Sequence, residues 1–176
     1  LEAGEQAYGS LKNGFYGLRA TLLMLTFMAL LRLRTPEQLQ GHPPGELGVL
    51  LGLDRAPEVK TLRRKLWELT ARQQAARFSR QLTQRWVSEN AQAVGLLYVD
   101  GHVRPYHGTT HKLPKAWVAR RRLCMPATTD IWVNQQDAQP LFVVSAEAND
   151  NLLAMLRREI LPQVRELVGE RRVTLA

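Results

Sequence analysis

The chain has 176 residues, 45% of them hydrophobic and 23% charged, which is the composition of a globular protein of one domain or of a small domain plus part of another. Its 24 Lys and Arg against 16 Asp and Glu give a net charge of +8, which favours polyanionic partners, nucleic acid first and an anionic membrane surface second. A single cysteine excludes an internal disulfide, and with four histidines it offers no zinc-finger spacing.

The segment 20–31 is almost wholly apolar and predicts a helix that is buried on most of its sides. A membrane-spanning helix needs about 20 apolar residues, so this segment is too short to cross a bilayer, and no signal-peptide pattern is present. We therefore expect no membrane partner and a cytoplasmic location. Thr35 then predicts an N-cap, with Pro36 at the first position of another short helix.

Residues 43–70 predict two short helices joined by a turn. The first runs over 46–51 with Leu47, Leu50 and Leu51 pointing inward, and a turn over 52–56 leads to a helix that begins at Pro57. Four apolar residues form one stripe of this second helix: Val59, Leu62, Leu66 and Leu69. The residues expected to point the other way, as candidate DNA contacts, are Lys60, Thr61, Arg63, Arg64 and Lys65. This pattern favours a helix-turn-helix whose second helix enters a major groove, and a helical hairpin with a solvated basic face is the alternative.

Positive charge is concentrated in residues 55–86. The segment holds two acidic residues, Glu58 and Glu68, and nine basic ones: Arg55, Lys60, Arg63, Arg64, Lys65, Arg72, Arg77, Arg80 and Arg85. The difference, nine minus two, is seven of the chain's net charge of +8. Such a concentration favours contact with a phosphate backbone. The apolar spacing over 73–89 predicts a helix that leads to the next segment.

Residues 94–111 carry the candidate catalytic side chain. The apolar run 96–99 predicts a buried strand with Asp100 at its end, and Gly101 permits a turn before an extended segment at 103–106. A carboxylate beside a buried strand is costly unless it is hydrogen-bonded, paired with a cation or bound to metal. An Asx-type turn in a hairpin is the equally supported alternative.

A second basic cluster follows at 111–122. It has no acidic residue, and it combines Trp117 with five candidate DNA contacts, namely Lys112, Lys115, Arg120, Arg121 and Arg122. Arginines beside a tryptophan suit phosphate clamping and base stacking, and a solvated loop is the alternative interpretation.

The remaining chain predicts two strands, a helix and another strand. Segments 128–133 and 140–146 are expected to form an antiparallel hairpin with its turn at 134–138. Asn149 and Asp150 predict the cap of a helix from 151 to about 168, which Pro162 kinks and Gly169 ends. A further strand begins at 172.

At this point the sequence resembles the ribonuclease H-like catalytic domain of DDE-type transposases. The resemblance is closest to bacterial transposases in which Tyr98-Val99-Asp100-Gly101-His102-Val103 precedes a Tyr-His-Gly stretch and a Lys-Leu-Pro-Lys segment, here at 106–108 and 112–115. The block 51–63 is similar to their helix-turn-helix region, and the resemblance covers most of residues 10–176.

The resemblance implies an α/β protein in two parts. Residues 1–92 are expected to be a helical DNA-binding region with the helix-turn-helix near 43–70. Residues 93–176 are expected to form the first half of a ribonuclease H-like mixed sheet, in the order β-β-β-α-β, truncated in the fourth strand. Since the chain begins at Leu1 and ends inside that strand, we expect an excised piece or a natural truncation that does not catalyse transposition on its own.

The activity that the resemblance implies is metal-dependent cleavage and transfer of DNA strands. Three carboxylates would hold two Mg²⁺ (or Mn²⁺) ions, and Asp100 matches the first of them as a catalytic and metal-binding residue. The other two are expected beyond the chain end, because hairpin and cap roles explain Asp130, Asp137, Glu147 and Asp150 better. His102 and His107 are candidate accessory residues for phosphate or water, unless they lie on a wet strand face.

The expected partners are double-stranded DNA and further copies of the chain, with nucleoid association in a bacterial cytoplasm. A non-enzymatic DNA-binding helix-turn-helix module, or a transposase remnant, is the alternative function and would leave Asp100 as a turn residue. A protein of the membrane surface is a weaker third option, because segment 20–31 lacks a clear polar face.

Overall fold

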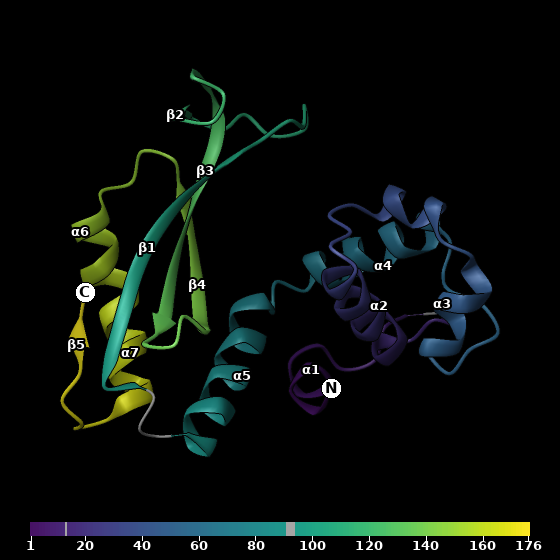
Figure 1. Cartoon of the computed structure of the whole chain (residues 1–176), viewed down its shortest axis with the longest axis horizontal. Helices are drawn as coiled ribbons and strands as arrows, with labels where there is room; N and C mark the ends of the chain where they lie inside the picture. Colours follow the sequence, from purple (N-terminus) through teal and green to yellow (C-terminus); the bar gives the residue numbers. More distant parts are fainter. Residues whose placement is uncertain (13, 91–93) are drawn as a thin grey trace. The chain divides into compact units, whose positions relative to one another are not determined.

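The structure, a computed structural model, describes residues 1–12, 14–90 and 94–176. Its N-terminal part is helical, and a mixed five-stranded sheet follows, so the predicted α/β class is confirmed (Figure 1). The chain divides into two compact units, Leu1–Gln81 and Leu82–Ala176. The boundary predicted between residues 92 and 93 lies outside the described residues.

The first unit is built from helices around a small apolar core. Its elements are α1 (Glu2–Tyr8), α2 (Leu18–Leu30), the 3₁₀-helix η1 (Pro36–Gly41), α3 (Pro44–Leu50), α4 (Val59–Ala71) and the start of α5 (Ala75–Glu89). The core side chains are Met24, Met28, Leu39, Leu47, Ala56 and Leu62. The helix predicted at 20–31 is confirmed, but full burial is limited to one stripe of it, and Leu30 is 72% exposed. Thr35 is the N-cap of η1, as predicted, and its N–H donates to Gln38 Oε1 at 3.1 Å.

The connection between α3 and α4 folds back against α3. The Leu53 N–H donates to the Gly48 carbonyl at 3.0 Å, and the Ala56 N–H donates to the Pro44 carbonyl at 2.7 Å. A Cβ on Gly48 would lie 2.4 Å from Arg55 Cα, so only glycine allows this approach.

Two details of this region differ from the prediction. Helix α4 begins at Val59 rather than Pro57, because Glu58 keeps an extended backbone (φ −62°, ψ 153°) and serves as the N-cap. Leu50, expected to point inward, is exposed because α3 buries Leu47 and Gly48 instead.

The second unit is organised around a long strand, β3. The strands are β1 (Leu96–Pro105), β2 (Lys115–Val118), β3 (Leu123–Gln135), β4 (Pro140–Glu147) and β5 (Thr174–Leu175). β3 pairs antiparallel with β1, β2 and β4, whereas β5 pairs parallel with β1. The predicted β3–β4 hairpin and the late strand are thus confirmed, and β2 is an additional strand that the sequence reasoning missed.

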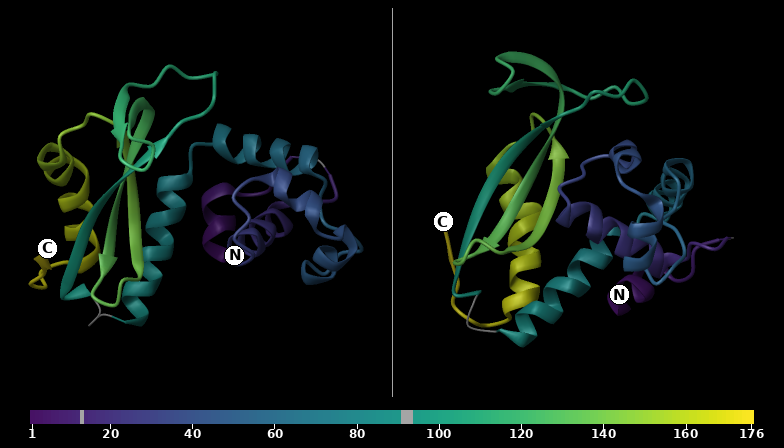
Figure 2. Two further views of the ribbon diagram at one scale, coloured as in Figure 1. Left: turned by 45° about the horizontal axis from the view of Figure 1, so that its top comes forward. Right: turned by 45° about the vertical axis from the view of Figure 1, so that its right-hand side comes forward.

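A continuous helical stretch connects β4 to β5 and covers one face of the sheet (Figure 2). It consists of α6 (Leu152–Met155), a π-helical turn (Leu156–Ile160) and α7 (Leu161–Val168). Pro162 has no N–H, and the interruption expected there takes the form of this turn, in which the Leu161 N–H donates to the Leu156 carbonyl. Gly169, at φ 62°, ends the helix as predicted.

The N-cap of this helix is Asn151 rather than Asn149 or Asp150. Its Oδ1 accepts the N–H of Leu153 at 2.8 Å and that of Ala154 at 3.3 Å, which satisfies two of the free donors of the first turn. Across the described part of the chain, no helix is both long enough and apolar enough to span a bilayer.

Candidate nucleic-acid interface

Helix α4 presents a basic face that ends in a tryptophan. Lys60, Arg63, Arg64 and Trp67 are all exposed and follow the spacing i, i+3, i+4, i+7, so they share one side of the helix. Trp67 is 76% exposed, and the sequence reasoning missed it although its spacing from the arginines was readable. Thr61, at the edge of this face, is half-buried. Three of the predicted basic contacts therefore lie together on an open helix surface.

Lys65 does not belong to this face, and its expected outward orientation is wrong. It lies between Leu62 and Leu69 on the inner stripe and is 2% exposed. Its Nζ donates to the Lys12 carbonyl at 2.7 Å and lies 3.6 Å from Glu68 Oε2. A helix position three residues after Leu62 and four before Leu69 shares their side of the helix, whatever its chemical type.

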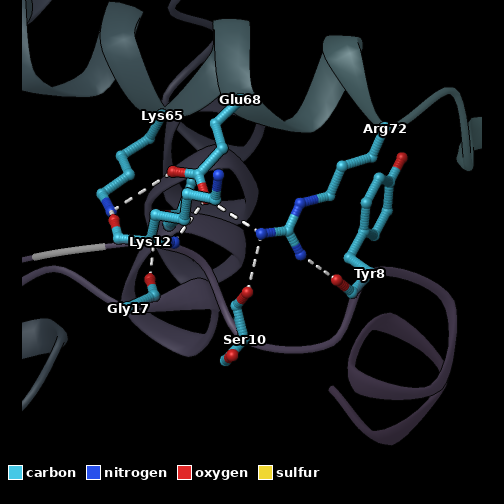
Figure 3. Close-up of polar contacts among 8 residues, drawn as sticks. Tyr8, Ser10, Lys12, Gly17, Lys65, Glu68 and Arg72 are labelled. Atoms are coloured by element: carbon cyan, nitrogen blue, oxygen red, sulfur yellow. Dashed lines mark hydrogen bonds and ion pairs between the residues drawn. The ribbon is translucent and has the colours of Figure 1, made fainter.

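Lys65, Glu68 and Arg72 form a polar cluster, which we call the α4 clasp (Figure 3). Glu68 Oε1 accepts the Lys12 N–H and an Arg72 Nη2 hydrogen bond of 2.9 Å. Arg72 also donates to the Tyr8 carbonyl and, at 2.7 Å, to the Ser10 carbonyl. The clasp thus fixes the backbone of residues 8–12 to the inner side of α4.

The clasp also changes the ionisation of Glu68. The hydrogen bond from the Lys12 N–H lowers the pKa of this carboxyl most, and the charges of Lys65 and Arg72 lower it further against the opposing effect of burial. Glu68 is therefore held as a carboxylate at the centre of the cluster.

Ion pairs neutralise much of the basic segment 55–86. Among the described residues, at least five of its nine basic residues are paired with a carboxylate within 4 Å: Arg55 with Glu58, Arg63 with Glu37, Lys65 and Arg72 with Glu68, and Arg85 with Glu89. The Arg63 pair, at 2.5 Å, brings a carboxylate of η1 onto the exposed face of α4. The high count of basic residues consequently overstates the charge that this segment offers to a partner.

A second basic surface is formed by residues 106–126, which we call the basic arm. It comprises the loop after β1, strand β2, the turn 119–122 and the start of β3, and it extends beyond the part of the sheet that α6 and α7 cover (Figures 1 and 2). Its base is tied to β3 by two backbone hydrogen bonds, from the Tyr106 N–H to Pro126 at 2.8 Å and from the Ala127 N–H to Pro114 at 3.1 Å.

The basic arm carries cations without acidic partners. No Asp or Glu occurs between Gly101 and Thr129. Within the described ranges, no ion pair or side-chain hydrogen bond involves its five exposed Lys and Arg residues, which are the predicted Lys112, Lys115, Arg120, Arg121 and Arg122. Trp117 lies among them and is 58% exposed. The arm therefore offers more uncompensated positive charge than α4 does.

Asp100 lies in the middle of β1 rather than at a strand end. Its backbone pairs with that of Trp132, and the pairing with β3 continues from Leu97 to Pro105. The prediction that the strand ends at Asp100 is therefore wrong, and the alternative of an Asx-type turn at Asp100 is excluded. The backbone of residues 100 and 101 stays in the β ladder because β3 continues beside it. Asp100 is exposed, and strand alternation places the exposed His102 on the same face of β1. His107 is exposed in the loop of the basic arm.

Asp130 is a buried carboxylate within the sheet. It is 2% exposed, lies opposite His102 in the register, accepts a 2.7 Å hydrogen bond from Ser145 Oγ and pairs with Arg104. Asp130 therefore lies within a strand of the predicted β3–β4 hairpin, as expected, and its side chain is held by both neighbouring strands. Asp137 does have a turn role, since its Oδ1 accepts the Gln139 N–H at 3.2 Å.

The described residues do not by themselves fit a divalent ion. They include no group of three His, Cys, Asp or Glu that could hold a metal. Mg²⁺ requires several oxygen ligands. The nearest carboxylate along the register from Asp100 is Asp130, which Arg104 and Ser145 already occupy.

The comparisons with known proteins assign the family. A family model described as a transposase protein matches residues 3–172, which includes most of both units. The chain therefore belongs to this transposase family. Neither the curated proteins nor the solved structures include a match to the chain.

Proposed function

We propose that this transposase-family chain binds double-stranded DNA, with α4 as the recognition helix of a helix-turn-helix formed with α3. The observation that supports this most directly is the exposed face of α4, where Lys60, Arg63 and Arg64 lie on the side opposite the buried leucines. A helix with its basic side chains on one open face fits the width of a major groove.

Arg63 would change partners on binding. In the free chain its guanidinium is held by Glu37 at 2.5 Å. A DNA phosphate is an anionic acceptor, as a carboxylate is, so it can replace Glu37 as the partner of the Arg63 guanidinium. The pair keeps Arg63 in place before contact and lowers the net affinity.

The basic arm would supply a second DNA contact. Its five Lys and Arg residues have no acidic neighbours, so phosphate contacts there release counterions without first breaking ion pairs. The arm and α4 belong to different compact units, and each contact is proposed independently.

The sheet supports a ribonuclease H-like interpretation of the second unit. Three antiparallel strands are followed by a helix and by a strand parallel to β1, which is the expected β-β-β-α-β order with β2 added. On this interpretation Asp100 would be one ligand of a Mg²⁺ or Mn²⁺ centre for strand cleavage. Such a centre needs further carboxylates, so Asp100 alone defines no catalytic step.

DNA binding can be tested by fluorescence anisotropy with a labelled duplex over a series of salt concentrations. Arg63→Ala with Arg64→Ala should weaken binding and reduce the salt slope by about two, since each phosphate contact contributes about 0.9. Arg77→Ala with Arg165→Ala removes the same charge from exposed positions outside the face and serves as the matched control.

If both double variants lost the same amount of duplex affinity, the proposal that α4 forms a specific DNA-binding surface would be contradicted, and only the net charge of the chain would matter. Circular dichroism of each variant checks that the helices remain folded. Asp100→Ala then separates the transposase centre from a non-enzymatic DNA-binding module, because only the former predicts a change in Mn²⁺ affinity.

A further inference from the structure

We propose that the basic arm binds unpaired DNA bases, with the indole of Trp117 as the surface on which a base stacks. This inference rests on the proposed DNA-binding function and specifies the form of DNA that one of its surfaces takes. It adds base stacking on unpaired or distorted DNA to the phosphate contacts proposed for the arm, and it leaves recognition of the duplex to α4.

The position of Trp117 leaves more than half of its surface exposed. Strand alternation puts Lys115 and Trp117 on one side of β2, and Ala116 and Val118 on the other. The buried side is that of Val118, so Trp117 is not a core residue. Its register partner across the ladder is Cys124, whose small side chain is also exposed. No ring stacks on the Trp117 indole among the aromatic pairs of the described residues.

The exposure of Trp117 would not by itself indicate a binding site, since single exposed apolar residues are common. The positive charge around Trp117 is the second observation that indicates one. Trp117 lies between Lys115 and the three arginines of the turn 119–122, and no acidic residue occurs within twelve positions on either side. A partner must therefore combine negative charge with a flat apolar face, and a nucleotide has both.

Base pairing decides which nucleotide can use this surface. In a duplex the faces of each base are covered by its neighbours in the stack, so an aromatic side chain reaches them only where bases are unpaired or unstacked. Stacking on an aromatic ring tolerates any sequence, because every base has a π-face. The arm thus supplies phosphate contacts and a stacking surface without the groups needed to read a particular base.

The arm is also held in place before DNA arrives. Its turn is closed by the N–H groups of Arg121 and Arg122, each of which donates to the Val118 carbonyl at 2.9 Å, and Arg122 has φ 52°. The loop before β2 is held by the His111 N–H, which donates to Tyr106 Oη at 3.3 Å. A surface fixed in this way loses less conformational entropy on binding than a flexible loop would.

The experiment compares two labelled DNAs of the same sequence, one fully paired and one with a short single-stranded gap. The wild-type chain should bind the gapped DNA more tightly. Trp117→Ala and Trp117→Leu should each weaken gapped binding by about 5- to 150-fold, the range for loss of one stacked base, and leave duplex binding nearly unchanged. Trp117→Phe, which keeps an aromatic ring, should retain part of the preference.

Two controls make the outcome specific. Trp86→Ala removes an exposed tryptophan from α5, outside both proposed DNA surfaces, and should leave the ratio of gapped to duplex affinity unchanged. Trp117→Leu keeps apolar bulk in β2, so its loss of preference with an unchanged melting curve assigns the effect to stacking and not to folding.

A wild-type chain without preference for the gap would overturn the inference, as would a preference that survives in Trp117→Leu. These results are distinct from failure of the proposed function. If duplex binding is insensitive to Arg63 and Arg64 while the gap preference depends on Trp117, the proposal for α4 fails and that for the arm stands. If duplex binding depends on Arg63 and Arg64 but the ratio of gapped to duplex affinity does not depend on Trp117, the proposal for the arm fails and that for α4 stands.

Discussion

Neutralising Glu68 should destabilise the helical unit strongly, because this one carboxylate is the shared acceptor of the α4 clasp. In Glu68→Gln the shape is kept and the charge is lost. The hydrogen bond from the Lys12 N–H becomes a neutral one, and the bond from the Arg72 guanidinium loses its anionic acceptor, so each loses about 0.5–1.5 kcal/mol. Lys65, 2% exposed, keeps its charge and loses the Glu68 carboxylate that lies 3.6 Å from its Nζ.

Removing one partner of a buried ion pair costs about 3–5 kcal/mol. The Lys65 ammonium still donates to the Lys12 carbonyl at 2.7 Å, so only part of that penalty applies. We expect a total loss of about 2–4 kcal/mol, which is a large part of the 5–15 kcal/mol typical of a domain. Adding Lys65→Met to Glu68→Gln should restore part of this loss, since it removes the buried charge whose carboxylate partner is gone.

Urea unfolding followed by circular dichroism at several pH values is the assay. The pKa of Glu68 is lowered in the folded state from its ordinary value of 4.5, chiefly by the Lys12 hydrogen bond. The stabilisation is therefore fully present above pH 4.5 and is lost as the pH falls through the folded-state pKa. The difference in unfolding free energy between wild type and Glu68→Gln should accordingly be largest near neutral pH and shrink in acid.

The surface pair Arg85–Glu89 provides the control. Glu89 is 63% exposed, and Glu89→Gln should change the unfolding free energy by less than about 1 kcal/mol. An effect of Glu68→Gln no larger than that of the control, or one that does not vary with pH, would refute the role given to the clasp.

Two further predictions concern the region around α4. Gly48→Ala should lower the unfolding free energy by about 1–3 kcal/mol or more, because the new Cβ would lie 2.4 Å from Arg55 Cα and backbone atoms cannot move aside as a side chain can. A thermal melt measures the effect, and Gly41→Ala is the control because open space surrounds Gly41. Glu37→Gln should tighten duplex binding by about two- to fivefold in the anisotropy assay, because it removes the carboxylate that pairs with Arg63. Glu89→Gln removes the same charge away from α4, and an equal gain in affinity for that variant would show that only the net charge of the chain matters.

The sequence predicted most of the elements because their apolar spacing is regular. It placed the helices at 20–31 and 151–168 and the β3–β4 hairpin correctly. It missed β2, whose alternation is masked by lysine and tryptophan on the exposed side. It also ended the first strand at Asp100, because Gly101 suggested a turn, whereas pairing with β3 keeps both residues in the ladder.

Side-chain roles were harder to predict, since they depend on contacts distant in sequence. Lys65 was grouped with its basic neighbours by chemical type, although its helical position lies on the leucine stripe. What makes its burial tolerable is the Lys12 carbonyl and Glu68, and the first of these is 53 residues away in the chain. In the same way Asp130 is buried because Arg104 and Ser145 come from the two strands beside it.

Charge counts along the sequence are misleading for a related reason. The segment 55–86 accounts for seven of the eight net charges, yet at least five of its basic residues are paired with carboxylates, two of which, Glu37 and Glu89, lie outside the segment. The cation and the carboxylate of an ion pair largely cancel each other's field at distances greater than their separation, and salt screens the remainder with a Debye length of about 8–10 Å. The basic arm has fewer cations, but they have no such partners within the described ranges. Under the proposed function, the arm should therefore dominate the long-range attraction of DNA, while the face of α4 acts at contact distance.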